Sequence, residues 1–207
     1  MYYHRQLEPT LRKAAEEFAC ITLYGARQTG KSTMVRMLFD GIEYVTLDQS
    51  RERLLASEDP ELFLQSHAVP LVIDEIQKVP ELMEAVKIRI DEAKLESVRT
   101  GTKTGLMYIL TGSNTHEIKE KASETLAGRT AIIEVTSLSE SEKRQVEGND
   151  FFPDINVLMN RKGKLAAKNR FEVFTEIYKG GMPEYWINEP DRNTFFESYI
   201  STYLEKD

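Results

Sequence analysis

The segment that most constrains the fold of this chain is residues 25–33, GARQTGKST. It fits the pattern G-x-x-x-x-G-K-[ST], in which a glycine-bounded loop joins a strand to a helix. The preceding residues, Ile21–Tyr24, are typical of a short buried strand, and we expect a helix over Lys31–Phe39. The positions that the pattern fixes are Gly25, Gly30, Lys31 and Ser32. We interpret the segment as a phosphate-binding loop.

This loop has the chemistry to bind a nucleotide polyphosphate together with a magnesium ion. Glycines let the backbone turn tightly and point N–H groups at anionic oxygens, which also face the positive end of the following helix. Lys31 can then reach the β- and γ-phosphates of ATP, and the Ser32 hydroxyl can ligate Mg²⁺. Arg27 is either a second phosphate contact or a surface residue. The nucleotide-contacting residues that we expect are Gly25, Ala26, Arg27, Gln28, Thr29, Gly30, Lys31, Ser32 and Thr33.

A second motif, Val69–Glu75, supplies two adjacent carboxylates. Its apolar run is rich in β-branched residues, as expected of a strand buried on both faces of a parallel sheet. The run ends at Asp74 and Glu75, where ligands of open α/β sheets gather. We expect Asp74 to hold Mg²⁺ through water or through Ser32, and Glu75 to orient and deprotonate the attacking water. A small-molecule kinase of the same superfold would not need such a base.

Polar residues after the next expected strand are candidates for sensing the γ-phosphate. Ser113 and Asn114 follow the strand Leu106–Leu110 and emerge at the same sheet edge as the two carboxylates. Either side chain could hydrogen-bond the attacking water, or could cap the next helix, because Ser and Asn are favoured caps. The sequence leaves open which of the two is the sensor.

Arg129 stands between the fourth and fifth expected strands, directly after Gly128. A glycine there is typical of a helix C-cap, which would leave Arg129 as an exposed cation. The alternative is an arginine finger that neutralises transition-state charge on ATP, acting in cis or in trans. Asp48, at the end of the second expected strand, either caps the next helix or touches the magnesium shell.

The composition is that of a soluble globular protein. Of the 207 residues, 41% are hydrophobic and 29% are charged, and the net charge of −7 argues against a broad nucleic-acid-binding surface. The single cysteine, Cys20, excludes an internal disulfide and is expected to be buried. The chain has no basic-then-apolar leader and no apolar run approaching about 18 residues. We therefore predict no secretion, no membrane span and a cytoplasmic location.

Strands and helices alternate along the first part of the chain, which predicts an α/β fold with a doubly wound parallel sheet. The expected strands are Cys20–Tyr24, Glu43–Leu47, Val69–Glu75, Leu106–Leu110 and Ala131–Val135. The expected helices are Leu7–Phe18, Lys31–Phe39, Arg51–Ser57, Pro60–Ser66, Glu81–Val98 and Glu117–Leu126. We place the P-loop ATPase core at residues 1–140.

Residues 141–207 are expected to form a linker and a helical lid. A basic turn near Arg161–Lys164 either meets nucleic acid or is a solvated loop. The other elements expected here are a short helix and an irregular connection within 139–169, a helix over Phe171–Tyr178, a turn over Met182–Trp186 and an aromatic helix from about Asp191. No stop signal follows that last helix before Asp207, so we expect further chain, and with it a partner domain, beyond this point.

Several segments occur in the same order in a known family. They are GARQTGKST, YVTLDQ, VPLVIDEIQKVPEL, ILTGSNT, LAGRTAIIEVTSLSESE, and GGMPEYW followed by TYLEKD. On these segments, which span nearly all 207 residues, the chain resembles the AAA-type predicted ATPases that carry a C-terminal domain of unknown function. The segment SLSE lacks the proline that usually precedes LS in the family.

The resemblance implies a P-loop NTPase of the AAA/ASCE type, with a five-stranded parallel sheet in the order 5-1-4-3-2 and a small helical lid. By resemblance, Gly25 to Ser32 form the nucleotide loop, Asp74 and Glu75 are the magnesium and water-activating pair, and Thr111–Ser113 belong to the sensor region. Arg129 matches the arginine that follows the family's glycine. Family members usually continue into a C-terminal domain that is similar to restriction-endonuclease-like folds.

These observations predict an ATP-binding, Mg²⁺-dependent ATPase module in which hydrolysis drives or gates a C-terminal partner domain. A slow nucleotide-dependent signalling switch would share every motif, whereas the Asp-Glu pair and the sensor strand disfavour a small-molecule kinase. Self-association, and nucleic-acid binding through the further domain, remain open. The expected ligands are ATP or ADP and Mg²⁺, with Ser32 and Asp74 at the metal. The expected catalytic residues are Lys31, Glu75, Ser113, Asn114 and Arg129.

Overall fold

A computed structural model describes residues 2–113, 115–146, 154–161 and 168–204 of the chain. The chain divides into two compact units, the first being Leu7–Thr136 and the second Met1–Gln6 together with Ser137–Asp207. The division at Thr136 lies near the expected end of the ATPase core at residue 140, and it assigns the first six residues to the second unit.

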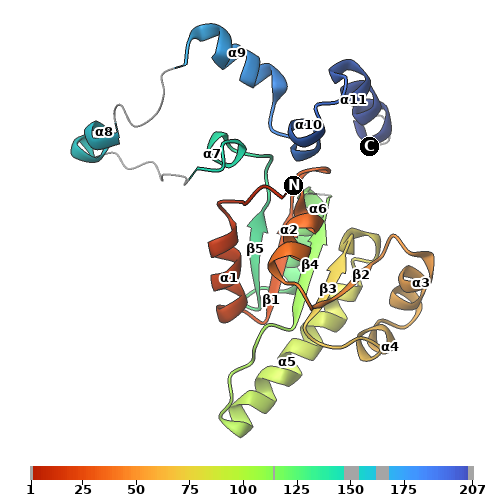
Figure 1. Cartoon of the computed structure of the whole chain (residues 1–207). Coiled ribbons are helices and arrows are strands. Elements are labelled where there is room, and N and C mark those ends of the chain that lie inside the picture. The colour runs from red at the N-terminus through yellow and green to blue at the C-terminus, as the bar shows by residue number, and fades with distance from the viewer. Residues whose placement is uncertain (1, 114, 147–153, 162–167, 205–207) are drawn as a thin grey trace. The chain divides into compact units, whose positions relative to one another are not determined.

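The first unit is built on a parallel sheet whose strands lie in the order β2-β3-β4-β1-β5 (Figure 1). This is the expected order 5-1-4-3-2, so the predicted α/β fold is confirmed. Both neighbours of β1 pair with it from its first residue, with Cys20 opposite Tyr108 and Thr130. The strands are β1 (Cys20–Tyr24), β2 (Glu43–Thr46), β3 (Leu71–Asp74), β4 (Tyr108–Gly112) and β5 (Thr130–Glu134).

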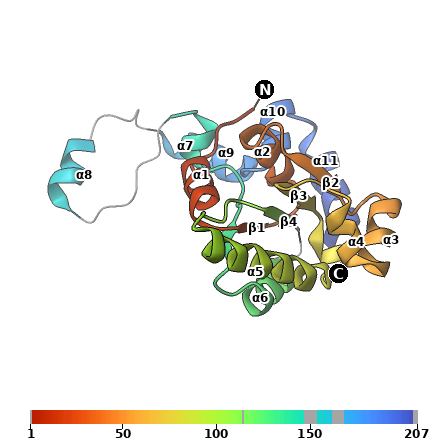
Figure 2. The same ribbon diagram turned by 90° about the horizontal axis from the view of Figure 1, so that it is seen from below.

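Helices cover both faces of this sheet, as a doubly wound fold requires. Figure 2 shows α1 and α2 on one face and α5 and α6 on the other. Each face has its own apolar core, one including Leu11, Met34 and Ile109 and the other including Val86 and Leu126. None of the described helices is both long and apolar enough to cross a membrane. The helices of this unit are α1 (Glu8–Glu17), α2 (Lys31–Leu38), α3 (Ser50–Glu58), α4 (Pro60–Gln65), the 3₁₀ turn η1 (Ile76–Lys78), α5 (Leu82–Thr100) and α6 (Thr115–Thr125).

Strand β4 differs from its expected range of Leu106–Leu110, because it begins at Tyr108 and continues through Thr111 to Gly112. The pairing with β1 explains the shift, since it starts at Tyr108 and ends with Gly112 opposite Tyr24. All five residues of β4 are buried, including the polar Thr111. The sequence interpretation ended the strand at the first polar residue and therefore missed a threonine inside the sheet.

The regular elements described in the second unit are all helices. A turn was expected over Met182–Trp186, but these residues mostly belong to the helix α10, which Pro183 begins. The indole N–H of Trp186 donates to the carbonyl oxygen of Gly180 at 2.7 Å. The expected basic turn at 161–164 lies outside the described residues except for Arg161. The helices here are α7 (Glu140–Lys143), α8 (Ile155–Arg161), α9 (Arg170–Lys179), α10 (Pro183–Asn188), α11 (Arg192–Tyr199) and a π-helical turn, η2 (Ile200–Leu204).

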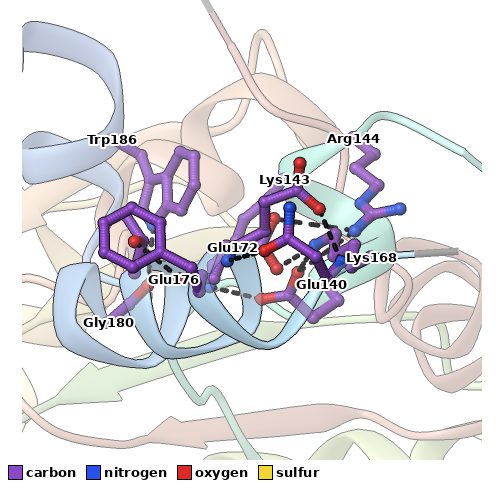
Figure 3. Close-up of polar contacts among 11 residues, drawn as sticks. Glu140, Lys143, Arg144, Lys168, Glu172, Glu176, Gly180 and Trp186 are labelled. Carbon is purple, nitrogen blue, oxygen red and sulfur yellow. Dashed lines mark hydrogen bonds and ion pairs between the residues drawn. The ribbon is translucent and has the colours of Figure 1, made fainter.

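Ion pairs connect α7 to α9 within this unit (Figure 3). Glu140 accepts from Lys143 at 2.7 Å and from Lys168 at 3.3 Å. Glu176, on α9, pairs with Lys168 and lies 3.6 Å from Arg144. Because the two carboxylates share Lys168, they bring the short helix α7 and the middle of α9 together.

A buried ion pair holds the N-terminal segment in the second unit. Arg5 Nε donates to Glu142 Oε1 at 3.0 Å, and the two side chains are only 5% and 6% exposed. The same carboxylate accepts the backbone N–H of Gln6 at 2.8 Å and, in a capping box, that of Ser139 at 2.7 Å. Burial alone would raise the pKa of Glu142, but these N–H groups and Arg5 together hold it below its usual range.

We predict that Glu142→Gln destabilises the chain by on the order of 3 kcal/mol, because it removes the carboxylate that pairs with the buried Arg5. Since the folded pKa of Glu142 is depressed, its contribution is complete at neutral pH and is lost as the pH falls through that pKa. Denaturant unfolding of wild type and variant between pH 3 and 7 measures both effects. Glu140→Gln, on the same helix but 53% exposed, should cost less than about 1 kcal/mol. Equal losses from the two substitutions would contradict the prediction.

Candidate active site

The ends of three neighbouring strands form the candidate site. Strands β3, β4 and β1 are adjacent and parallel, so their carboxyl ends lie at one edge of the sheet. The loop that begins at Gly25 follows β1, Asp74 ends β3, and Ser113 follows β4. This edge therefore brings together the phosphate loop, the paired carboxylates and the candidate sensor.

The glycines of the phosphate loop stand where a side chain does not fit or where the backbone is left-handed. At Gly25 (φ +152°) an added Cβ would overlap the carbonyl oxygen of Val135, so a side chain does not fit. Gln28 (φ 61°) and Gly30 (φ 86°) are both left-handed, and Gly30 is the N-cap of α2. The Thr29 hydroxyl donates to the carbonyl oxygen of Ala26 at 2.9 Å, which closes the loop on itself.

Lys31 lies inside this loop. Its ammonium donates to the carbonyl oxygens of Gly25 and Ala26, both at 2.7 Å, and the residue is only 6% exposed. Burial lowers the pKa of Lys31, while the nearby carboxylates Glu75 and Asp74 act in the opposite direction. The side chain is thus held at the centre of the loop by acceptors that phosphate oxygens could replace.

Three hydroxyl groups surround the buried carboxylate of Asp74. Ser32, on α2, donates to Oδ1 and Oδ2 at 3.3 and 3.2 Å, and Tyr44, on β2, donates to Oδ2 at 2.5 Å. Thr111, on β4, donates to Oδ1 in a buried contact. Burial and the neighbouring Asp74 raise the pKa of Tyr44 to about 12, so its hydroxyl stays protonated at any ordinary pH.

The chemistry of Asp74 and Ser32 fits a magnesium ion. Mg²⁺ takes oxygen ligands and is usually bound through one or two carboxylates together with substrate phosphates and water. The carboxylate of Asp74 and the hydroxyl of Ser32 are such donors, and they lie 3.2 Å apart. Their role at a metal stays a prediction that this donor set supports.

Glu75 has a different environment from its neighbour. Its backbone is left-handed (φ 59°, ψ 43°), which separates it from β3 and begins the turn η1. Its Oε2 accepts from Ser113 Oγ at 3.2 Å and from the amide nitrogen of Gln77. Arg27, in the phosphate loop, donates to the Ser113 hydroxyl, with its Nε 3.4 Å from Ser113 Oγ. Ser113, as the sensor candidate, therefore touches the expected base directly.

Three other expected residues either lie outside the described part of the chain or lie away from the candidate site. Asn114 lies outside the described residues, so its sensor role is untested. Arg129 precedes β5 and accepts from the backbone N–H of Cys20, so it lies at the amino end of the strands, opposite to the phosphate loop. There its guanidinium pairs with Asp91 through contacts of 2.6 and 2.8 Å. Within this unit its guanidinium does not reach the site, and its role as a finger stays a prediction. Asp48 pairs with Lys78 and its side chain neither caps α3 nor touches Asp74.

Three contacts at the site were not expected from the sequence. Tyr44 and Thr111 touch Asp74, and Gln77 touches Glu75. A polar residue in an otherwise apolar strand was the available signal for Thr111, since a buried hydroxyl needs a partner. Tyr44 carried no such signal, because a tyrosine on a strand is ordinary.

The fold and the loop define the chain as a P-loop α/β protein of the AAA class. A family model described as an AAA domain matches residues 17–143. Because this match spans more than half of the sequence, the chain belongs to that AAA domain family, and the resemblance seen in its motifs is confirmed.

Other comparisons agree with this assignment. The Walker-type ATPase PABY2304 of Pyrococcus abyssi has a similar fold, with a TM-score of 0.56 and 16% identity over 99% of this chain and 75% of that one. Two uncharacterized proteins, Mb2031c of Mycobacterium bovis and Rv2008c of Mycobacterium tuberculosis, are each 24% identical over 206 residues. These residues are 98% of this chain but only 39% of each relative, so the chain spans about two fifths of their length.

We predict that Tyr44→Phe lowers the free energy of unfolding by about 1.5–3 kcal/mol, the usual contribution of a hydrogen bond to a charged group. The loss arises because the buried Asp74 keeps one donor fewer. Denaturant unfolding at neutral pH measures it. Tyr178→Phe removes a hydroxyl from a residue that is 60% exposed and should change stability by less than about 0.5 kcal/mol. A Tyr44→Phe protein as stable as this control would show that Asp74 does not depend on Tyr44.

Proposed function

We propose that this chain binds ATP and hydrolyses it in a Mg²⁺-dependent reaction to ADP and phosphate. The observation that carries the proposal is the meeting of Lys31, Asp74 and Glu75 at one edge of the sheet, beside a loop that accepts only glycine at its first position. Membership in an AAA domain family supports nucleotide binding independently of this geometry. ATP and Mg²⁺ are abundant in the cytoplasm, which is where we propose that the protein acts.

Each residue of the site has a distinct task in this mechanism. Lys31 exchanges the carbonyl oxygens of Gly25 and Ala26 for β- and γ-phosphate oxygens of ATP. Asp74 and Ser32 would hold Mg²⁺, which neutralises charge developing on the phosphates. Glu75 accepts a proton from the attacking water through its carboxylate, and Ser113 hydrogen-bonds that carboxylate.

We further propose that hydrolysis drives or gates a partner domain outside the chain described here. The support is that the two curated relatives are more than twice as long as the segment that matches this chain. Within this proposal, Arg129 acts in trans, on ATP bound by a neighbouring subunit, because it lies at the edge of its own sheet opposite to the phosphate loop. Its pairing with Asp91 would have to open for that role.

Two measurements separate this function from its alternatives. A nucleotide switch would bind ATP but turn it over no faster than its Glu75→Gln variant. A small-molecule kinase would transfer phosphate to an acceptor instead of releasing it, and a screen of acceptors would reveal this. Nucleic acid is a partner only if DNA or RNA stimulates the turnover of a longer protein that includes the partner domain.

We predict that Lys31→Ala weakens ATP binding roughly ten- to a hundred-fold. The substitution removes the side-chain cation at the phosphates, and a charge-assisted contact contributes about 1.5–3 kcal/mol. Calorimetric titration with a non-hydrolysed ATP analogue measures the affinity. Lys13→Ala, which removes an exposed lysine from α1, is the matched control and should bind as wild type does. Unchanged affinity of Lys31→Ala would contradict the assignment of the phosphate loop.

We predict that Glu75→Gln keeps ATP and Mg²⁺ binding but lowers turnover by about 10²- to 10⁴-fold, because an amide preserves the shape of the side chain and cannot accept the proton. Asp74→Asn should instead weaken the dependence on Mg²⁺. Phosphate release and nucleotide affinity are measured in parallel, with Glu96→Gln, an exposed change on α5, as control. If Glu75→Gln hydrolyses ATP at the wild-type rate, Glu75 is not the general base.

A further inference from the structure

Gln77 makes contacts that neither the motif nor the proposed mechanism assigns to a role. It lies in η1, two residues after Glu75, and its amide nitrogen donates to Glu75 Oε2. The same nitrogen lies 3.2 Å from Ser113 Oγ, which in turn donates to Glu75 Oε2 at 3.2 Å. Three side chains thus form a closed set of hydrogen bonds around a single carboxylate oxygen.

Only one of the two orientations of the Gln77 amide lets it donate a hydrogen bond to Glu75. A carboxylate accepts hydrogen bonds and donates none when ionised, so the nitrogen of the amide has to face Glu75. The amide oxygen, Oε1, is buried over Gly112, where an added Cβ would overlap it. Among the described residues Oε1 has no hydrogen-bond partner. The packing over Gly112 therefore holds the donor end of Gln77 against the carboxylate.

The two carboxylate oxygens of Glu75 differ in the number of hydrogen bonds that they accept. Both donors, Gln77 and Ser113, reach Oε2, whereas none of the described residues donates to Oε1. The carboxylate consequently has one oxygen that is fixed by hydrogen bonds and one that keeps its lone pairs for a new partner. A base that accepts a proton from water needs such an oxygen in a defined position.

We propose that Gln77 is a positioning residue for ATP hydrolysis, which fixes the side chain of Glu75 so that Oε1 is the proton acceptor. This inference rests on the proposed function. It adds that Ser113 shares the task with Gln77, so that the γ-phosphate sensor candidate and the base are one hydrogen-bonded unit. Gly112 contributes to the same arrangement, because its lack of a side chain leaves room for the amide of Gln77.

The test is Gln77→Met, which keeps the length of the side chain and removes its hydrogen-bond donor. We expect kcat to fall roughly ten- to a hundred-fold, because the lost contact is a hydrogen bond to a charged group. We expect KM and the calorimetric affinity for an ATP analogue to stay at the wild-type values, because the side-chain hydrogen bonds of Gln77 go to Glu75 and Ser113 and not to the phosphate loop or Asp74. A general structural defect would change affinity together with turnover.

Two further variants make this test decisive. Gln77→Ala removes the same donor with a smaller side chain, so a packing defect peculiar to methionine is recognised. Gln65→Met is the matched control, because Gln65 also donates to a carboxylate, Glu61 Oε1 at 2.9 Å, but does so at the exposed surface of α4. It should leave kcat and affinity unchanged.

A double-mutant cycle with Glu75→Gln shows whether Gln77 acts through Glu75. If it does, Gln77→Met slows single-turnover hydrolysis in the wild-type background and has no effect in the Glu75→Gln background. The same loss in both backgrounds, or wild-type turnover of both Gln77 variants, overturns the inference while leaving the proposed function intact. Undiminished turnover of Glu75→Gln has a different meaning, because it overturns the proposed function and, with it, the base that Gln77 would position.

Discussion

The buried carboxylate of Asp74 is the constraint on which the site depends. An ionised group in this environment is costly unless it is hydrogen-bonded, and three hydroxyls from three different elements meet that need. Ser32 comes from α2, Tyr44 from β2 and Thr111 from β4, so one side chain joins the helix after the phosphate loop to both neighbours of β3. The same contacts that stabilise the sheet edge therefore fix the distance between the loop and the carboxylate pair.

Adjacent residues at this edge have opposite environments. Asp74 is nearly enclosed, and its oxygens are both occupied by hydroxyl donors. One residue later the backbone turns left-handed and gives Glu75 a carboxylate with donors on one oxygen only. A carboxylate with donors on both oxygens suits a fixed negative charge. A carboxylate with donors on one oxygen only suits the acceptance of a proton on the other oxygen. The left-handed residue between β3 and η1 is what allows a single dipeptide to supply both.

The sequence predicted the parts of the site that depend on local spacing. The order of Gly25, Lys31 and Ser32 specifies the loop and the start of α2, and an apolar strand ending in two acids specifies Asp74. It could not predict Tyr44 or Gln77, because their contacts depend on the register of separate elements and leave no periodic signal. The position of Arg129 depends on the topology of the sheet and not on local spacing. A residue that precedes a parallel strand lies at the edge opposite to residues that follow one, so topology, and not proximity in a motif, decides where it points.

The close packing of Gly25 against Val135 has a mechanical consequence. Val135 follows β5 directly and donates its N–H to Tyr24, the residue before the loop, at 2.8 Å. The chain leaves the first unit immediately afterwards, at Thr136. The first peptide of the loop thus packs directly against the residue that follows β5, with no space for a side chain between them. Any residue other than glycine at position 25 would therefore disturb the end of β5 as well as the phosphate loop.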